Sequence, residues 1–171
     1  MNPTRDQRGF VLIELITVIV LIGMIAAFTT FFLYTGFKGY EDTKTRNEGA
    51  LSAQMALDRI TLELRDINSI VPTPSGTSVI YKSAALSGTR TLKYVGVNIL
   101  INIDPPGGVA GDYMLLEDIS AFNLSYTYQN LDHDTVPVDE VARIDVEFNL
   151  SGIEKKFGAK IFPRNMVPKT W

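Results

Sequence analysis

The hydrophobic pattern begins with one long apolar run, from Phe10 to about Tyr34, in which Glu14 is the only acid. At about 1.5 Å rise per residue, some 24 residues form a helix of about 36 Å, longer than the roughly 30 Å hydrocarbon core of a bilayer. Because lipid offers the backbone no hydrogen-bond partners, a helix is the form expected there. The pattern therefore predicts a transmembrane helix over residues 10–34.

Beyond this run, the pattern becomes amphipathic over residues 35–70. Apolar side chains recur at spacings of three, four and one, which is typical of one helical face; they are Ala53, Ala56, Leu57, Ile60, Leu64 and Ile67. Charged side chains, namely Asp58, Arg59, Glu63 and Arg65, are expected on the rest of the helix surface. Pro72, Pro74 and Gly76 are expected to end the helix. We predict one nearly continuous helix from Phe10 to about Asn68.

From Thr77 onward the period changes to two, which predicts β-strands. The two clearest are Phe122–Tyr128 and Arg143–Leu150, whose alternate residues are apolar. Ser151-Gly152 is a plausible two-residue hairpin turn leading into a last strand. Shorter candidates are Ser78–Lys82, Arg90–Gly96, Asn98–Ile103, Tyr113–Leu116 and Lys155–Phe162. We expect an α+β fold, in which a C-terminal β-rich domain of residues 71–171 packs an antiparallel sheet, with one wet face, on the long helix.

Composition limits the function classes. A chain of 171 residues accommodates one membrane helix and one small domain. Its net charge of −3 and the lack of a basic stripe argue against nucleic-acid binding as the main task. Cysteine is absent, which excludes disulfides and thiolate metal sites.

The N-terminus carries a short motif, in which Arg8 and Gly9 precede Phe10, Leu12 follows, and Glu14 is the single acid in the apolar run. This motif resembles the N-terminus of type IV prepilins and of the pseudopilins of type II secretion. The resemblance implies that residues 1–9 are a leader peptide. It also implies that a prepilin peptidase cuts between Gly9 and Phe10 and methylates the new amine of Phe10.

The rest of the chain supports this resemblance less specifically. Three further segments are similar to minor pilins and to the J-type minor pseudopilin. They are Ala56–Ile60 with Glu63–Arg65, Leu115-Leu116 leading into Phe122–Tyr126, and the end of the last strand at Ile161–Asn165. Many major pilins carry a C-terminal disulfide, so within this resemblance the absence of cysteine favours a minor subunit.

Glu14 is the anomaly within the apolar run. A carboxylate at mid-bilayer costs on the order of 3 kcal/mol, and less near a helix end. One interpretation is that Glu14 lies close enough to the helix start to reach the headgroups. The other is that cleavage creates a cationic amine at Phe10, which the Glu14 of a neighbouring subunit pairs with during filament assembly, as the resemblance implies.

The orientation follows from the charges near the apolar run. Arg5 and Arg8 precede it, which favours a cytoplasmic N-terminus and a periplasmic domain. An ordinary secretory signal has a shorter apolar region followed by a small-residue cleavage site. The apolar run of this chain is longer and lacks such a site, so it does not match a secretory signal. We expect a single-pass protein of the bacterial inner membrane that then enters a periplasmic or extracellular filament.

A search for catalytic or metal-binding motifs finds little. There is no phosphate-binding loop, and His133 is the single histidine, in a polar loop without a nucleophile motif. The loop with Asp132, Asp134, Asp139 and Glu140 offers oxygen ligands for calcium, but its spacing matches no ligand frame, and a solvated acidic loop is favoured. We expect no enzyme activity, no cofactor and no metal site.

Two function classes remain. In the first, the chain is a minor pseudopilin or minor pilin, in an initiating tip complex. Its expected partners are other pilin or pseudopilin subunits, the prepilin peptidase, the inner-membrane assembly platform and membrane lipid, without nucleic acid. In the second, the helix is a passive tether for an extracytoplasmic binding module. A narrower alternative is a competence pseudopilus for DNA uptake.

Overall fold

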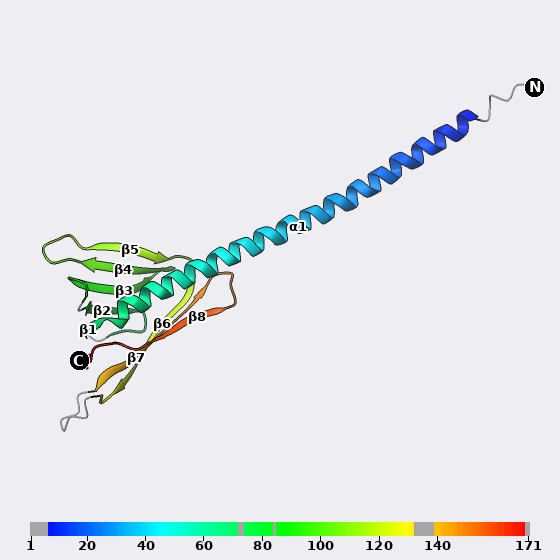
Figure 1. The fold of residues 1–171 in the computed structure, drawn as a ribbon. Coiled ribbons are helices and arrows are strands. Elements are labelled where there is room, and N and C mark those ends of the chain that lie inside the picture. The colour runs from blue at the N-terminus through cyan, green and yellow to red at the C-terminus, as the bar shows by residue number, and fades with distance from the viewer. Residues whose placement is uncertain (1–6, 72–73, 84, 132–138, 170–171) are drawn as a thin grey trace, which may run out of the picture. The chain divides into compact units, whose positions relative to one another are not determined.

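The computed structural model describes residues 7–71, 74–83, 85–131 and 139–169, with side chains from Val11 onward. The chain divides into two compact units, unit 1, Met1–Asn47, and unit 2, Glu48–Trp171. Helix α1, Gln7–Arg65, contributes to both units (Figure 1). It runs without interruption through Gly23, Gly36 and Gly39. One long N-terminal helix with antiparallel sheets confirms the predicted α+β class.

The predicted C-terminal end of the helix is wrong. α1 ends at Arg65, and strand β1, Ile67–Ile70, takes up residues that were expected to be helical. β1 pairs antiparallel with β2, Ser78–Ser83, in a register that sets Ile70 opposite Tyr81. Both isoleucines of β1 are fully or almost fully buried. Pairing with β2 satisfies the backbone while it buries Ile67 and Ile70, so the tertiary structure overrides the helical continuation of the pattern.

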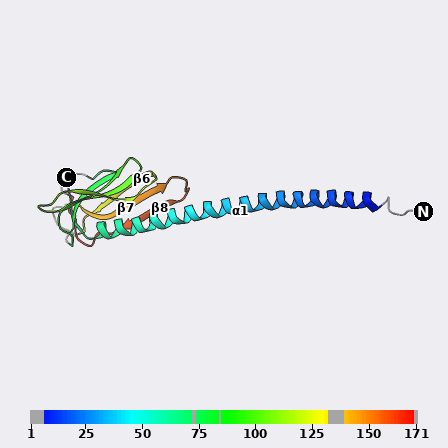
Figure 2. The ribbon, with the colours of Figure 1, turned by 90° about the horizontal axis from the view of Figure 1, so that it is seen from above.

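The apolar face predicted for the second half of the helix is confirmed. Its residues are all buried in unit 2 and form one core with the strands; they are Ala53, Ala56, Leu57, Ile60 and Leu64, joined by Ile67 of β1. Figure 2 shows both sheets on one side of this helix segment. Glu63, which was expected on the polar surface, is instead only 2% exposed.

The strands form two antiparallel sheets instead of the single sheet that was expected. The five-stranded sheet has the order β1-β2-β3-β4-β5, and the three-stranded sheet has the order β6-β7-β8. The remaining bounds are β3 Thr89–Val95, β4 Asn98–Asp104, β5 Gly111–Leu116, β6 Ile119–Gln129, β7 Glu140–Leu150 and β8 Lys156–Ile161. Every pairing between neighbouring strands joins consecutive segments, so each sheet is a meander.

The division between the sheets lies at Asp118. This residue has a φ of 59°, in the left-handed region that aspartate tolerates better than most residues. Its carbonyl accepts a hydrogen bond from the backbone N–H of Ser151 at 2.7 Å. The chain therefore leaves β5 and begins β6 in a different sheet, a change that the alternating pattern of the sequence does not encode.

The alternation predicted for the two longest strands is confirmed. Their apolar residues point into the core, with Tyr126 and Tyr128 partly buried; the buried members are Phe122, Leu124, Ile144, Val146, Phe148 and Leu150. The turn at Ser151-Gly152 is present, with Gly152 at a φ of 75°. β8 starts at Lys156, one residue after the expected Lys155, so residues 153–155 join the turn to the strand.

The segment after β8 closes the C-terminal end of α1. The backbone N–H of Arg164 donates to the carbonyl of Arg65 at 2.8 Å. The side-chain Nδ2 of Asn165 donates to the carbonyl of Ile67 at 2.9 Å. The last carbonyls of a helix have no partner within the helix, so this segment satisfies groups at the helix end and at the start of β1.

Replacing Asn165 by alanine should lower the free energy of unfolding by about 1 kcal/mol, because the part-buried carbonyl of Ile67 loses its donor. Calorimetry of the full chain in detergent micelles measures this change. Asn102→Ala is the control, because its Nδ2 contacts the exposed Asp112 carboxylate, and it should cost under about 0.5 kcal/mol. Equal losses for both variants would contradict a closing role for Asn165.

Candidate functional site on the apolar segment of helix α1

The apolar segment of α1 presents its side chains outward. Every residue from Val11 to Glu48 is exposed. The helix is long and apolar enough to cross a membrane, by length and composition. A helix that is hydrophobic all round belongs inside lipid or inside an assembly of helices. This surface is therefore the first candidate for function, because it needs to be covered by another molecule.

Hydroxyl groups in this segment are satisfied within the helix. Each threonine side chain donates to the carbonyl four residues earlier, at 2.8 to 3.0 Å; these are Thr17, Thr29, Thr30 and Thr35. In lipid, such internal bonds remove the cost of an unpaired hydroxyl. The hydroxyl groups of these threonines therefore need no hydrogen-bond partner outside the helix.

Glu14 differs from the threonines. Its carboxylate is exposed on α1, and no hydrogen bond or ion pair to it is found among the side chains that the structure describes. Gly9 and Phe10 lie in the same helix, so the backbone of Phe10 is one helical turn from Glu14. The structure thus brings the predicted cleavage residues next to the predicted assembly residue.

Aromatic residues mark the end of the apolar segment. Tyr34, Phe37 and Tyr40 are about two-thirds exposed and flank Lys38, the first charged residue after Glu14. Aromatic side chains are enriched where a membrane helix meets water, because they combine an apolar ring with a polar edge. Their position matches the boundary expected at the end of a membrane helix.

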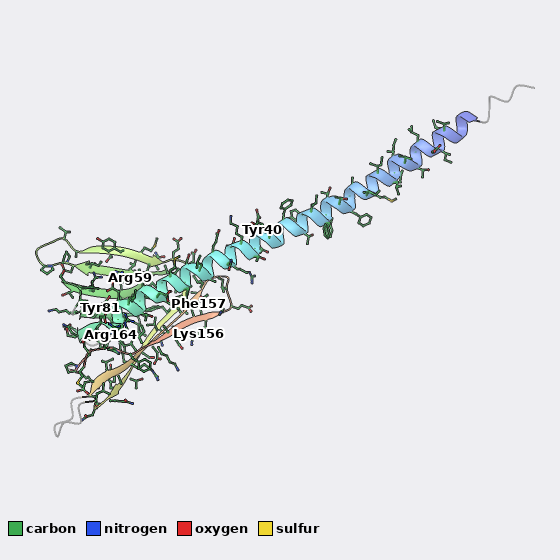
Figure 3. All side chains as sticks on the ribbon, viewed as in Figure 1. Tyr40, Arg59, Tyr81, Lys156, Phe157 and Arg164 are labelled. Carbon is green, nitrogen blue, oxygen red and sulfur yellow. The ribbon has the colours of Figure 1, made fainter. Side chains whose placement is uncertain are left out.

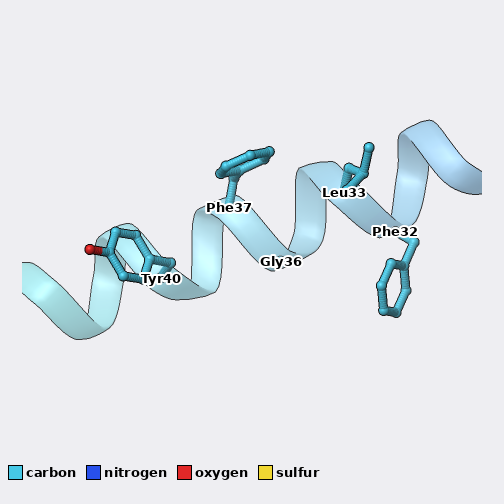
Figure 4. Close-up of a pocket in the computed structure, with 5 residues that line it drawn as sticks. All are labelled: Phe32, Leu33, Gly36, Phe37 and Tyr40. Atoms are coloured by element: carbon cyan, nitrogen blue, oxygen red, sulfur yellow. The ribbon is translucent and has the colours of Figure 1, made fainter.

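A shallow apolar hollow lies at Gly36 (Figure 4). A Cβ added at Gly36 meets no atom within 4 Å. Packing inside the described chain therefore does not require glycine at this position. The hollow lets a neighbouring helix or a lipid chain approach the backbone closely. The residues around it are Phe32, Leu33, Phe37 and Tyr40.

In unit 2, a charge cluster surrounds the buried Glu63, which the amphipathic pattern did not predict. Its Oε1 accepts from Arg59 at 2.6 Å and from Arg90 at 2.9 Å, and its Oε2 accepts from the Tyr81 hydroxyl at 3.0 Å. Figure 3 labels Arg59 on the helix and Tyr81 on β2. The signal was available in the spacing, because Glu63 directly precedes Leu64 and follows Ile60 by three residues, at the border of the apolar face.

The cluster joins the helix to the five-stranded sheet. Burial, reinforced by the adjacent Glu63 carboxylate, raises the pKa of Tyr81 far above its ordinary value, so the hydroxyl keeps its proton and donates. Glu63, Tyr81 and Arg90 are buried among core residues, Arg59 is half exposed, and each of these polar partners comes from this chain. The arrangement therefore has the properties of a structural ion-pair cluster.

No metal site emerges in the part of the chain that is described, where no group of three or more His, Asp or Glu side chains is placed to hold an ion. Most of the predicted acidic loop, including Asp132, His133 and Asp134, lies outside the described residues. The expectation of a solvated loop is wrong at Glu140. That residue begins β7, is 3% exposed, and accepts a hydrogen bond from the backbone N–H of Leu131 at 2.7 Å.

Comparison of the chain with models of protein families, with curated proteins and with solved structures finds no match.

Proposed function

We propose that this chain is a filament subunit of the prepilin type, a minor pseudopilin or minor pilin. Its residues 1–9 are removed by a prepilin peptidase, and the amine of Phe10 is methylated. The observation that carries the proposal is the carboxylate of Glu14 on an exposed apolar helix, for which the described side chains provide no partner. The Gly9-Phe10 motif one turn earlier supports it.

The energetics support a role between molecules for Glu14. A single acid in lipid costs on the order of 3 kcal/mol, and this helix carries no described cation that offsets it. Cleavage before Phe10 generates a positive amine at the same level of the segment. When two processed helices lie side by side, the amine of one pairs with the Glu14 of the other, and both charges leave lipid together. Assembly then gains free energy and a defined register.

The location and partners follow from this role. The positive charges of Arg5 and Arg8 hold the leader in the cytoplasm, where the peptidase and the assembly platform of the inner membrane act on the chain. Unit 2 then faces the periplasm, and later the filament surface. Membrane lipid and related subunits cover the apolar helix in turn. No catalytic step and no nucleic acid enters this account.

The intact mass and N-terminal sequence of the full chain, recovered from membranes, test the proposal. In cells with a prepilin peptidase, the chain is expected to begin at Phe10 and to carry one added methyl group. In cells without the peptidase, it is expected to begin at Met1. Both samples come from the same expression system, so the peptidase is the only difference between them.

A chain that keeps residues 1–9 in both strains would contradict the proposal. The Gly9-Phe10 motif would then be a coincidence, and α1 would be a passive tether for an extracytoplasmic binding module. That outcome leaves the membrane helix itself intact, because its apolar composition does not depend on cleavage.

A further inference from the structure

The water-facing side of α1 in unit 2 is unusually apolar. Three large apolar side chains there are half or more exposed, Leu51 at 62%, Met55 at 58% and Leu62 at 52%. An amphipathic helix with one buried face normally carries polar residues on the other. The six exposed positions between residues 51 and 62 are Leu51, Gln54, Met55, Asp58, Arg59 and Leu62.

These apolar residues form one line along the helix. At about 3.6 residues per turn, Leu51, Met55 and Leu62 lie within roughly 40° of each other, and Asp58 lies between Met55 and Leu62. The buried Ile60 lies about half a turn away. Both sheets lie on one side of this helix segment (Figure 2). We call Leu51, Met55, Asp58 and Leu62 the outer stripe; it faces away from the core.

The spacing of the outer stripe specifies a helical partner. Its intervals of four, three and four residues are those of the contact positions in a coiled coil. A strand or a flat sheet has no matching period. Asp58 is the exception in an otherwise apolar stripe. A single polar residue at such a position sets the register of a helix pair, provided that its charge finds a partner.

Arg59 of a second copy would supply the charge that Asp58 needs. Asp58 accepts a hydrogen bond from Gln54 at 3.0 Å, and no ion pair to it is present within the described part of the chain. Arg59 is half exposed, and one of its nitrogens binds Glu63, which leaves further N–H donors of the guanidinium free. In a parallel, in-register pair, Asp58 of each helix lies beside Arg59 of the other, so the two-fold symmetry creates two ion pairs.

We propose that the outer stripe pairs two copies of this chain in parallel through the α1 segment 51–62 while both are anchored in one membrane. Three apolar side chains per chain bury far less than the roughly 1,200 Å² typical of a stable complex. Anchoring therefore matters, because it aligns the helices and raises their effective concentration. The pairing goes beyond the proposed filament role, since a passively tethered chain would pair equally well.

The absence of cysteine allows a direct test in the full chain. Met55→Cys places one thiol on the outer stripe, and Gln54→Cys places one on the neighbouring exposed position outside it. Under mild oxidation in membranes, Met55→Cys is expected to give a disulfide-linked dimer at a yield about tenfold above that of Gln54→Cys. The reason is that only stripe positions bring the two Cα atoms within the roughly 7 Å limit of a disulfide.

A second variant tests the register. Asp58→Lys, added to Met55→Cys, is expected to lower the dimer yield about tenfold, which corresponds to about 1.4 kcal/mol. Asp58 is exposed, so the melting temperature of the chain should stay unchanged in this variant. An unchanged dimer yield, equal yields from Met55→Cys and Gln54→Cys, or no dimer at all would overturn the proposal.

The same measurement separates this pairing from filament assembly. Glu14→Val, combined with Met55→Cys, is expected to keep the disulfide dimer, because the outer stripe lies in unit 2 and Glu14 in unit 1. Loss of the dimer in the Glu14→Val background would show that the contact forms only inside filaments, and would overturn pairing in the membrane. Retained residues 1–9 would contradict the filament role and leave the pairing proposal standing.

Discussion

Replacing Glu63 by glutamine should lower the free energy of unfolding of unit 2 by about 3 kcal/mol. The carboxylate is 2% exposed and accepts from Arg59, Arg90 and Tyr81. The neutral amide of glutamine has only one oxygen acceptor. Its NH₂ group is itself a donor, so it cannot accept from Arg59, Arg90 or Tyr81. Arg90, whose side chain is 9% exposed, then keeps a buried charge without its counter-ion. Calorimetry on heating, or near-ultraviolet circular dichroism during denaturant titration, measures this change in the free energy of unfolding for the full chain in detergent micelles.

Glu147→Gln is the matched control for this prediction. Glu147 binds Lys156 at 2.6 Å, the same distance as the Arg59–Glu63 pair, but its side chain is 42% exposed. Water and salt screen an exposed pair, so its removal should cost under about 1 kcal/mol. A similar loss for both substitutions would contradict the claim that burial, rather than the short distance, gives the Glu63 cluster its importance.

Replacing Glu14 by valine should leave membrane insertion intact and reduce incorporation into filaments at least about tenfold. Insertion becomes easier, because the valine side chain avoids the cost of up to about 3 kcal/mol for a carboxylate in lipid. Assembly loses the proposed pairing of the carboxylate with the amine of a neighbouring subunit, and a tenfold loss corresponds to only about 1.4 kcal/mol. The amount of the chain in sheared filaments, divided by the amount in membranes, gives the effect.

Thr17→Val serves as the control for Glu14→Val. It introduces the same side chain in the same apolar segment, one turn further along. Because the Thr17 hydroxyl donates to the carbonyl of Ile13, no other molecule depends on it, and incorporation should stay at the level of the unmodified chain. Normal incorporation of Glu14→Val would exclude the role in assembly that we assign to Glu14.

The sequence by itself determined the elements that depend on local pattern. The apolar run up to about Tyr34 predicted a helix, because a run that is long enough to cross a bilayer must satisfy its own backbone there, and α1 covers it. The buried face around Ile60 and the alternation of β6 and β7 were read from periods of 3.6 and two, since a residue's face follows directly from its position in the chain. Glu14 could also be recognised from the sequence, because it is the single charged residue in the apolar run.

The tertiary structure decided where these elements stop and how they combine. Helix α1 ends at Arg65 because Ile67 and Ile70 gain more from pairing and burial in β1 than from another helical turn. Asp118 separates the two sheets through a backbone conformation that the alternation does not record. Arg90 comes from a strand 27 residues after Glu63. The burial of Glu63 therefore depends on contacts between distant segments, which form only when the helix and the sheet are packed together.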